Sequence, residues 1–316
     1  MDSQQKLRGM LEGALLGAVW VLLLYLTMYT PLFFVTAILL PIPLTILTYR
    51  QGMQIAGMTA VLFVLLAAIF NLLFVGFNFV LYSVVMGIVS GYCLYYRKPT
   101  TVILLGGALA TLATLLGTLV ILRVLTGYDM MSDFAVSFQQ SLDQSASMLE
   151  SMGMASQLEG IEAINIDQMV SMMRMMMPTV FIIISAMNAY VYYWIVIHVF
   201  KRLGEKIPQL PSLTVLRLPK SILGYYVVAI FAMLFMNSFD STGGFWYLLV
   251  FSIVQILTLA LAVQGISVLW FYMKKQKWPS IARVPILFLL LHPLVFQITA
   301  WIGMLDMFFN WRRLLK

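Results

Sequence analysis

Long uninterrupted apolar stretches limit the folds open to this chain more than any other feature of its sequence. Each stretch is about 20 residues long or longer, which is the length of apolar helix that spans the hydrocarbon core of a bilayer. Membrane-spanning strands would alternate apolar and polar side chains with a period of two, and these stretches do not alternate. We therefore predict an all-α fold, a polytopic membrane helix bundle of eight or nine apolar segments. The segments are expected at residues 9–29, 31–49, 53–75, 77–96, 100–125, 176–200, 221–239, 245–273 and 284–311.

The composition argues against a soluble domain and against a nucleic-acid partner. The chain is 62% hydrophobic and 10% charged, with a mean hydropathy of +0.96, whereas soluble domains carry about 25% charged residues. The net charge of +7 comes from bases at segment ends, a pattern typical of membrane orientation rather than of a phosphate-binding stripe. Cys93 is the only cysteine, so no disulfide or cysteine-based metal site is expected, and no cofactor is predicted. The partner that the composition predicts is the lipid bilayer.

The distribution of lysine and arginine predicts the orientation. With the N-terminus in the cytoplasm, the basic residues of 50–52, 97–99, 201–220 and 274–283 all fall on the inner side. This arrangement follows the positive-inside rule. We therefore predict a multi-pass protein of a bacterial cell membrane with a cytoplasmic N-terminus. His292–Pro293 interrupts the last segment, so whether residues 284–311 cross fully, and on which side the chain ends, stays open.

One polar stretch breaks the apolar pattern. Residues 124–173 contain seven acidic residues and no lysine or arginine. Within them Phe134, Phe138, Leu142 and Leu149 recur at helical spacing with polar residues between, which predicts an amphipathic helix. A second such helix is expected after Leu158. The orientation places this acidic amphipathic helical lobe, residues 126–175, on the extracytoplasmic side, as a cover over the outer mouth or as a plain solvated loop.

Polar residues at one level of the predicted bundle suggest a ligand pocket. Asn71 and Asn78 flank the turn between two segments on the outer side, and Arg123 and Arg174 stand at the same side against the positive-inside trend. Asn188 lies deeper. We consider two interpretations: these residues line an outward-facing pocket for a small polar or anionic solute, or the arginines pair with acids of the lobe.

Small residues recur at a spacing of four in the first segment. They are Gly9, Gly13 and Gly17, with Ala14 and Ala18 shifted by one position. Small residues at this period let two helix backbones approach closely. The stripe predicts either internal packing or the docking of a partner helix.

Two further polar features fall inside apolar segments. Asp306 lies seven residues before Arg313, nearly on the same helical face, which predicts a structural ion pair at the membrane edge. Gln255 and Gln264 face opposite sides of their segment and are expected to form interhelical hydrogen bonds. The sequence holds no Walker loop, HExxH or G-x-S-x-G motif. We therefore predict neither an enzyme nor a metal site.

The chain resembles the YybS-like family of uncharacterised bacterial polytopic membrane proteins. The resemblance rests on residues 13–18 of the first segment, which include small residues, and on the apolar organisation of nearly the whole chain. It also rests on the ending 303–313, with its sequence GMLDMFFNWRR. No activity follows from this family. Its genes often lie near one for a membrane-bound cyclic-dinucleotide phosphodiesterase, so the resemblance implies that enzyme as a possible partner.

Residues 9–200 also resemble, more distantly, the S-components of energy-coupling-factor transporters. Those proteins have six helices, bind a solute under their outer loops, and dock an energy-coupling module through A-x-x-x-A on the first helix. Ala14 and Ala18 match that spacing. The segments after residue 200 and the lack of a vitamin-binding motif depart from the pattern, so no substrate is implied.

These observations predict three parts and two alternative functions. The parts are a six-helix membrane half 1–200 that includes the lobe, a basic cytoplasmic linker 201–220, and a C-terminal membrane half 221–316. The first function is non-enzymatic binding, or help with import, of a small solute at an outward-facing pocket. The alternative is a scaffold or regulatory partner of another membrane protein. The sequence names neither the solute, the energy source nor the oligomeric state.

Overall fold

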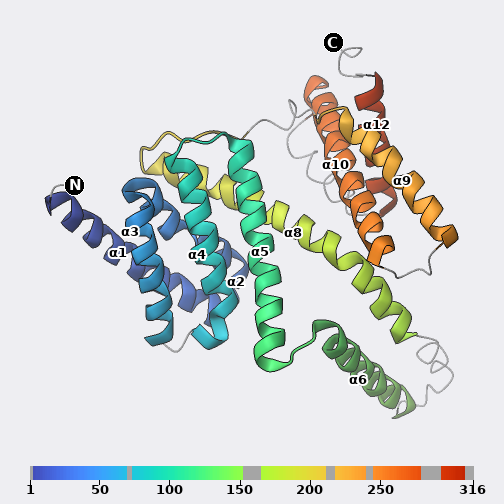
Figure 1. Cartoon of the computed structure of the whole chain (residues 1–316), viewed down its shortest axis with the longest axis horizontal. Coiled ribbons are helices and arrows are strands. Elements are labelled where there is room, and N and C mark those ends of the chain that lie inside the picture. The colour runs from blue at the N-terminus through green and yellow to red at the C-terminus, as the bar shows by residue number, and fades with distance from the viewer. Residues whose placement is uncertain are drawn as a thin grey trace. The chain divides into compact units, whose positions relative to one another are not determined.

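The computed structural model describes residues 3–69, 73–151, 165–210, 218–239, 245–278 and 293–309, and among these residues all the regular secondary structure is helical (Figure 1). The helices of the N-terminal part are α1 (Ser3–Tyr29), α2 (Phe33–Leu39), α3 (Ile42–Ile69), α4 (Leu73–Tyr95), α5 (Thr100–Thr126) and α6 (Met130–Ser151). Those of the C-terminal part are α8 (Ile166–Arg202), α9 (Ser221–Phe239), α10 (Phe245–Lys275) and α12 (Pro293–Phe309).

Six of these helices are long and apolar enough to cross a membrane by length and composition. They include α1, α4, α5, α8, α10 and the stretch Phe33–Ile69. Two shorter apolar helices, Ser221–Phe235 and Leu294–Phe309, accompany them. The predicted class, an all-helical membrane bundle, is therefore confirmed.

The boundaries of the predicted segments need three corrections. The predicted break at Gly76, between the segments 53–75 and 77–96, lies inside α4, which begins at Leu73. The segment 31–49 is broken at Leu40–Pro41, where α2 ends and α3 begins, since proline has no N–H for a continuous helix. The last segment yields a described helix only from Pro293, a residue favoured at the first helical position; residues 284–292 lie outside the described part.

The chain divides into two compact units. The first consists of residues 1–133 and 181–210, and the second of residues 134–180 and 211–316. Helix α8 contributes its first part to the second unit and the rest to the first. The predicted division at 201–220 stays a prediction.

In the first unit, α3 reverses direction at Gly52. The backbone there is not helical, with φ of 79° and ψ of −175°. Gly13 of α1 faces Thr59, and Gly17 faces Phe63. Because both residue numbers rise together, the part of α3 after Gly52 runs parallel to α1. This reversal coincides with the predicted boundary between the second and third segments. Glycine fits because a side chain at this φ and ψ would be strained.

The part of α3 that precedes Gly52 packs closely on α4. A Cβ added at Gly87 would stand 2.9 Å from the Cβ of Leu44, and one added at Gly91 would stand 2.9 Å from the carbonyl oxygen of Thr45. The order of these contacts shows that residues 44–48 run parallel to α4. Two glycines one turn apart on α4 therefore let the two backbones approach closely.

Aromatic packing fixes α1 in the same unit. Trp20 is fully buried and stacks on Phe63, with ring centroids 4.4 Å apart. Its indole N–H donates to the Ser83 hydroxyl of α4 at 3.1 Å. Burying an aromatic ring while its polar atom finds a partner is the arrangement expected of a core tryptophan.

In the second unit, α10 and α12 cross at two glycines. A Cβ added at Gly265 would meet the carbonyl oxygen of Thr299, and one added at Gly303 would meet that of Leu261. Buried Tyr226 of α9 belongs to one hydrophobic cluster with Leu261 of α10 and Ala300 of α12. Side chains at either glycine would separate the helices.

Helix α6 is the described part of the predicted acidic lobe. It begins after Asp129, whose carboxylate accepts hydrogen bonds from the N–H groups of Met131 and Ser132 at 3.0 and 3.3 Å. Phe134 and Phe138 lie half-buried on one face, as the spacing predicts. The lobe as a whole is not shown, because residues 152–164, which include the start of the second predicted helix, lie outside the described residues.

Candidate functional site

Polar side chains from three helices of the first unit come together between α4, α5 and α8. We call them the polar cluster: Asn78, Tyr82, Thr111, Thr114, Thr118, Ser185 and Asn188. Thr111, Thr114 and Thr118 share one face of α5, since their spacing of three and four residues is that of a helix. The opposing helices supply the remainder. The cluster thus runs along the bundle rather than across it.

Asn188 is the centre of the cluster. Its amide oxygen accepts hydrogen bonds from the Tyr82 hydroxyl at 2.8 Å and from the Thr111 hydroxyl at 3.3 Å. Its amide nitrogen donates no hydrogen bond to any residue that the structure describes. The amide oxygen of half-buried Asn188 is therefore engaged, and the two N–H donors of its amide nitrogen remain available.

Asn78 repeats this arrangement two turns further along. Its amide oxygen accepts from the Thr118 hydroxyl at 3.0 Å, and within the described part of the chain its nitrogen has no partner either. Asn78 and Thr118 are half-buried, whereas Thr111 and Thr114 are 4% and 3% exposed. Along α5, exposure thus falls from Thr118 to Thr114 and Thr111, whereas Asn188 on α8 is half-buried.

Ser185 differs from the other hydroxyl residues of the cluster in its hydrogen bonding. It is 1% exposed, and its hydroxyl has no hydrogen-bond partner among the described residues. Thr111, Thr114 and Thr118 all donate to a carbonyl of their own helix, but Ser185 does not. Buried polar groups are nearly always paired, so an unpaired hydroxyl one helical turn from Asn188 calls for a physical reason.

The cluster is closed on the side that leads away from Asn78. One turn beyond Asn188 on α8, fully buried Tyr192 shares a 2.6 Å hydrogen bond with the Thr45 hydroxyl. Gly87 and Gly91 hold α3 against α4 at this level. Tyr193 donates to the carbonyl of Pro208 at 2.7 Å and ties the chain after α8 to the same end. Tight packing therefore seals one end of the cluster.

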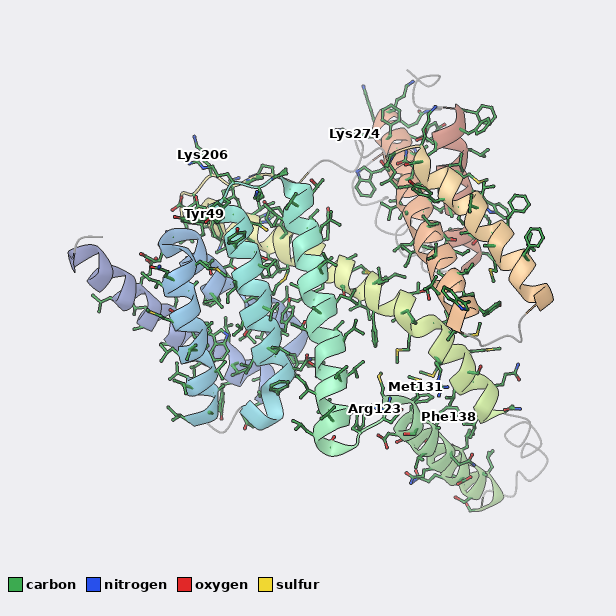
Figure 2. All side chains as sticks on the ribbon, in the orientation of Figure 1. Tyr49, Arg123, Met131, Phe138, Lys206 and Lys274 are labelled. Carbon is green, nitrogen blue, oxygen red and sulfur yellow. The ribbon has the colours of Figure 1, made fainter. Side chains whose placement is uncertain are left out.

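An ionic network reinforces the sealed end. Arg50, next to the reversal in α3, pairs with Glu12 of α1 at 2.6 Å and with Glu205 after α8 at 3.7 Å. The Tyr49 hydroxyl donates to Glu205 at 3.3 Å. Figure 2 shows Tyr49 and Lys206 together at this end of the first unit. Three segments far apart in the sequence are thus held together.

The structure does not bring all five predicted pocket residues together. Asn78 and Asn188 belong to the cluster. Arg123 is exposed and pairs with Asp129 at 3.5 Å, as the alternative with lobe acids predicted, and Figure 2 shows it at the end of α5 near Met131. Arg174 is exposed on the part of α8 that belongs to the second unit. Asn71 lies outside the described residues.

The small residues of α1 divide between two faces. Gly13 and Gly17 are buried against α3, whose nearest atoms would stand 3.4 and 3.6 Å from an added Cβ. Ala14 and Ala18 are exposed. The burial of Gly9 is not described. Gly13 and Gly17 therefore serve internal packing, whereas Ala14 and Ala18 lie on a face of α1 that the described residues leave exposed.

Asp306 is buried in the second unit, at 4% exposure. The Gln264 side-chain nitrogen donates to its carboxylate at 2.8 Å, and the Gln264 oxygen accepts from the backbone N–H of Leu218 at 3.1 Å. Arg313, its predicted ion-pair partner, lies outside the described residues. What the structure adds is that Gln264 links α12 to the chain before α9.

Gln264→Leu is expected to destabilise the second unit by about 1–3 kcal/mol, because it removes a donor from the buried Asp306 carboxylate and an acceptor from the half-buried N–H of Leu218. Gln255→Leu is the matched control: Gln255 is half-buried on the same helix and makes no hydrogen bond to any described residue. Thermal unfolding of the purified variants in lipid nanodiscs measures the difference. Equal melting temperatures for both variants would contradict the role of Gln264.

Sequence reasoning missed Tyr82, Ser185 and the three threonines of α5. Threonines at positions 111, 114 and 118 share a helical face, and this regularity could have been read from the sequence. No sequence signal distinguishes Ser185, because its missing partner is a property of the packing. No group of three or more metal-ligating side chains comes together in the described part.

Comparisons with known proteins agree with the predicted family. A family model described as "Predicted membrane protein (DUF2232)" matches residues 18–307. The chain is 25% identical over 316 residues to "Uncharacterized protein YybS" of Bacillus subtilis (strain 168), across 98% of this chain and 99% of that protein. No solved structure matches, so the distant resemblance to S-components stays a prediction.

Proposed function

This chain belongs to the DUF2232 family of predicted membrane proteins, and on that premise we propose that it is a non-enzymatic protein that binds a small solute at the polar cluster. Ser185 is the observation that carries the proposal. Its buried hydroxyl and the neighbouring Asn188 amide nitrogen lack partners among the described residues. Inside a membrane no bulk water satisfies such groups, and each costs free energy until something binds it.

The direction of entry follows from the two ends of the cluster. Its Asn78 end is half-buried, whereas glycine contacts and the Arg50 network close the other end. With the N-terminus in the cytoplasm, the Asn78 end faces outward. We therefore propose that the solute enters from the extracytoplasmic side, at the Asn78 end of the cluster.

Binding requires a small movement, because the deeper members of the cluster are buried. The helices α4, α5 and α8 would part at the Asn78 end while the glycine-packed end stays fixed. Helix-to-helix hydrogen bonds in membranes are worth about 0.6 kcal/mol each on average. Breaking the bond between Asn78 and Thr118 is therefore an inexpensive opening step.

Thiol accessibility tests the proposal, because Cys93→Ser yields a chain without cysteine. In that background, Thr114→Cys is expected to react with a neutral hydroxyethyl methanethiosulfonate in nanodiscs at least about tenfold faster than Leu116→Cys. Leu116 is the matched control, exposed on the opposite, lipid-facing side of α5. If Thr114→Cys is as inert as the control, the cluster is only interhelical packing and the proposal fails.

The proposed side of entry has its own test. Ser145 is exposed on α6, so Ser145→Cys is expected to react with a membrane-impermeant sulfonatoethyl reagent in intact cells, whereas Lys98→Cys reacts only after permeabilisation. The reverse pattern would place the half-buried end of the cluster in the cytoplasm. The solute would then enter from that side.

The exposure of Ala14 and Ala18 favours a second function, that of a scaffold. A pair of small residues on a lipid-facing surface permits close approach of a partner helix. The partners to consider are an energy-coupling module or a membrane-bound phosphodiesterase. Ala14→Leu combined with Ala18→Leu should then reduce recovery of that partner from mild detergent, while the folding of this chain is unaffected.

A further inference from the structure

We infer that the polar cluster selects an uncharged solute that binds through carbonyl or hydroxyl oxygens. The inference rests on the proposed function and deepens it by naming the class of solute. Its two supports are the charge and the hydrogen-bonding capacity of the cluster.

The helices that form the cluster carry almost no charge. Residues 73–95 of α4 contain no acidic or basic residue, and neither do residues 181–200 of α8 apart from His198. The only charged residue of α5 is Arg123, which is exposed and paired with Asp129. A charged solute at the level of Asn188 would lose its hydration and gain no counter-charge, and this penalty excludes it.

The free hydrogen-bonding groups of the cluster are donors. The amide oxygen of Asn188 already accepts from the Tyr82 hydroxyl, and the single proton of each threonine hydroxyl is already engaged. Thr111 and Thr118 share theirs between a carbonyl of α5 and the amide oxygen of Asn188 or Asn78. What remains within the described residues is the two amide nitrogens and the hydroxyl of Ser185. Groups that donate N–H and O–H bonds are satisfied by acceptor oxygens on the solute.

Among the described residues, a second buried hydroxyl has no hydrogen-bond partner, that of Thr179, and it does not belong to this site. Thr179 lies six residues before Ser185, which places it about 240° around α8. Ser185 instead shares the buried face with Ala189, whose Cβ would stand 3.3 Å from one added at Gly107 of α5. Ser185 therefore faces the α5 side of the cluster.

The test compares reagents of different charge at the same cysteine. In the Cys93→Ser background, Thr114→Cys is treated with methanethiosulfonates that carry a neutral hydroxyethyl, an anionic sulfonatoethyl or a cationic trimethylammonium group. Rates are normalised to Thr126→Cys, which is exposed at the end of α5. We expect the neutral reagent to react at Thr114→Cys at least about tenfold faster than either charged reagent.

A charge placed in the cluster should change this order. Asn188→Asp keeps the size of the side chain and introduces a carboxyl group. At a pH high enough to ionise this group, the cationic reagent is expected to accelerate about tenfold while the anionic one stays slow. Asn188→Gln, which adds no charge, is the matched control. It should leave the order of the three reagents unchanged.

The outcomes separate the two claims. If all three reagents modify Thr114→Cys at equal normalised rates, the site is accessible and the selection of uncharged solutes is wrong. If none reacts there although Thr126→Cys reacts, the proposed function fails, and the inference fails with it. A neutral preference that Asn188→Asp reverses for the cation alone supports both.

Discussion

Gly91→Ala is expected to destabilise the first unit by about 1–3 kcal/mol, because one methyl group would have to fit against the backbone of α3. The added Cβ would meet Thr48 and stand 2.9 Å from the carbonyl oxygen of Thr45. Backbone atoms cannot turn aside as a flexible side chain can, so α3 and α4 must separate. The melting temperature in nanodiscs and the fraction of monodisperse protein in detergent measure the effect.

Gly117→Ala is the control for this prediction. Gly117 lies in α5 and has no atom within 4 Å of an added Cβ, so alanine should stabilise the helix by about 0.5–1 kcal/mol. The two glycine replacements are thus expected to have opposite signs. A stabilising effect of Gly91→Ala would show that α3 and α4 do not pack as described.

Gly303→Ala is expected to have a comparable effect on the second unit. Its Cβ would meet the carbonyl oxygen of Leu261 and stand 2.7 Å from the backbone nitrogen of Gly265. The methyl group would therefore separate α10 from α12, at a cost of about 1–3 kcal/mol. Proteolysis of the purified variant should then cleave the second unit first.

The control for the second unit is Gly224→Ala in α9, where an added Cβ meets nothing within 4 Å. It should leave the melting temperature unchanged or raise it slightly. If Gly303→Ala and Gly224→Ala behave alike, the crossing of α10 and α12 is not set by glycine.

The sequence predicts the class of fold well because the bilayer imposes helix length. Helix α9 begins and ends where its apolar stretch does, and α5 differs from its predicted segment by a single residue at its C-terminal end. Apolarity alone does not distinguish a turn from a helix, so Gly76 was misplaced and the break at Leu40–Pro41 was missed.

The candidate site was only half predictable. Asn78 and Asn188 stand out because amides are costly in lipid, but pairing them with Thr118 and with Tyr82 depends on the register of α4 against α5 and α8. Arg123 was predicted to line the pocket because it lies on the outer side, against the positive-inside rule. In the structure it pairs instead with Asp129, six residues later. Register and local pairing arise from tertiary packing, which one sequence does not contain.

In the predicted topology, the reversal at Gly52 decides how often the chain crosses the bilayer. Residues 33–69 form one apolar stretch of 37 residues, and as a single straight helix they would extend about 55 Å, far more than a hydrocarbon core of about 30 Å. Because the chain turns at Gly52, the stretch would cross the membrane twice instead of once. Were the glycine unable to turn, every loop after it would emerge on the opposite face of the membrane. The backbone conformation of Gly52 thus determines on which side of the membrane each later loop lies.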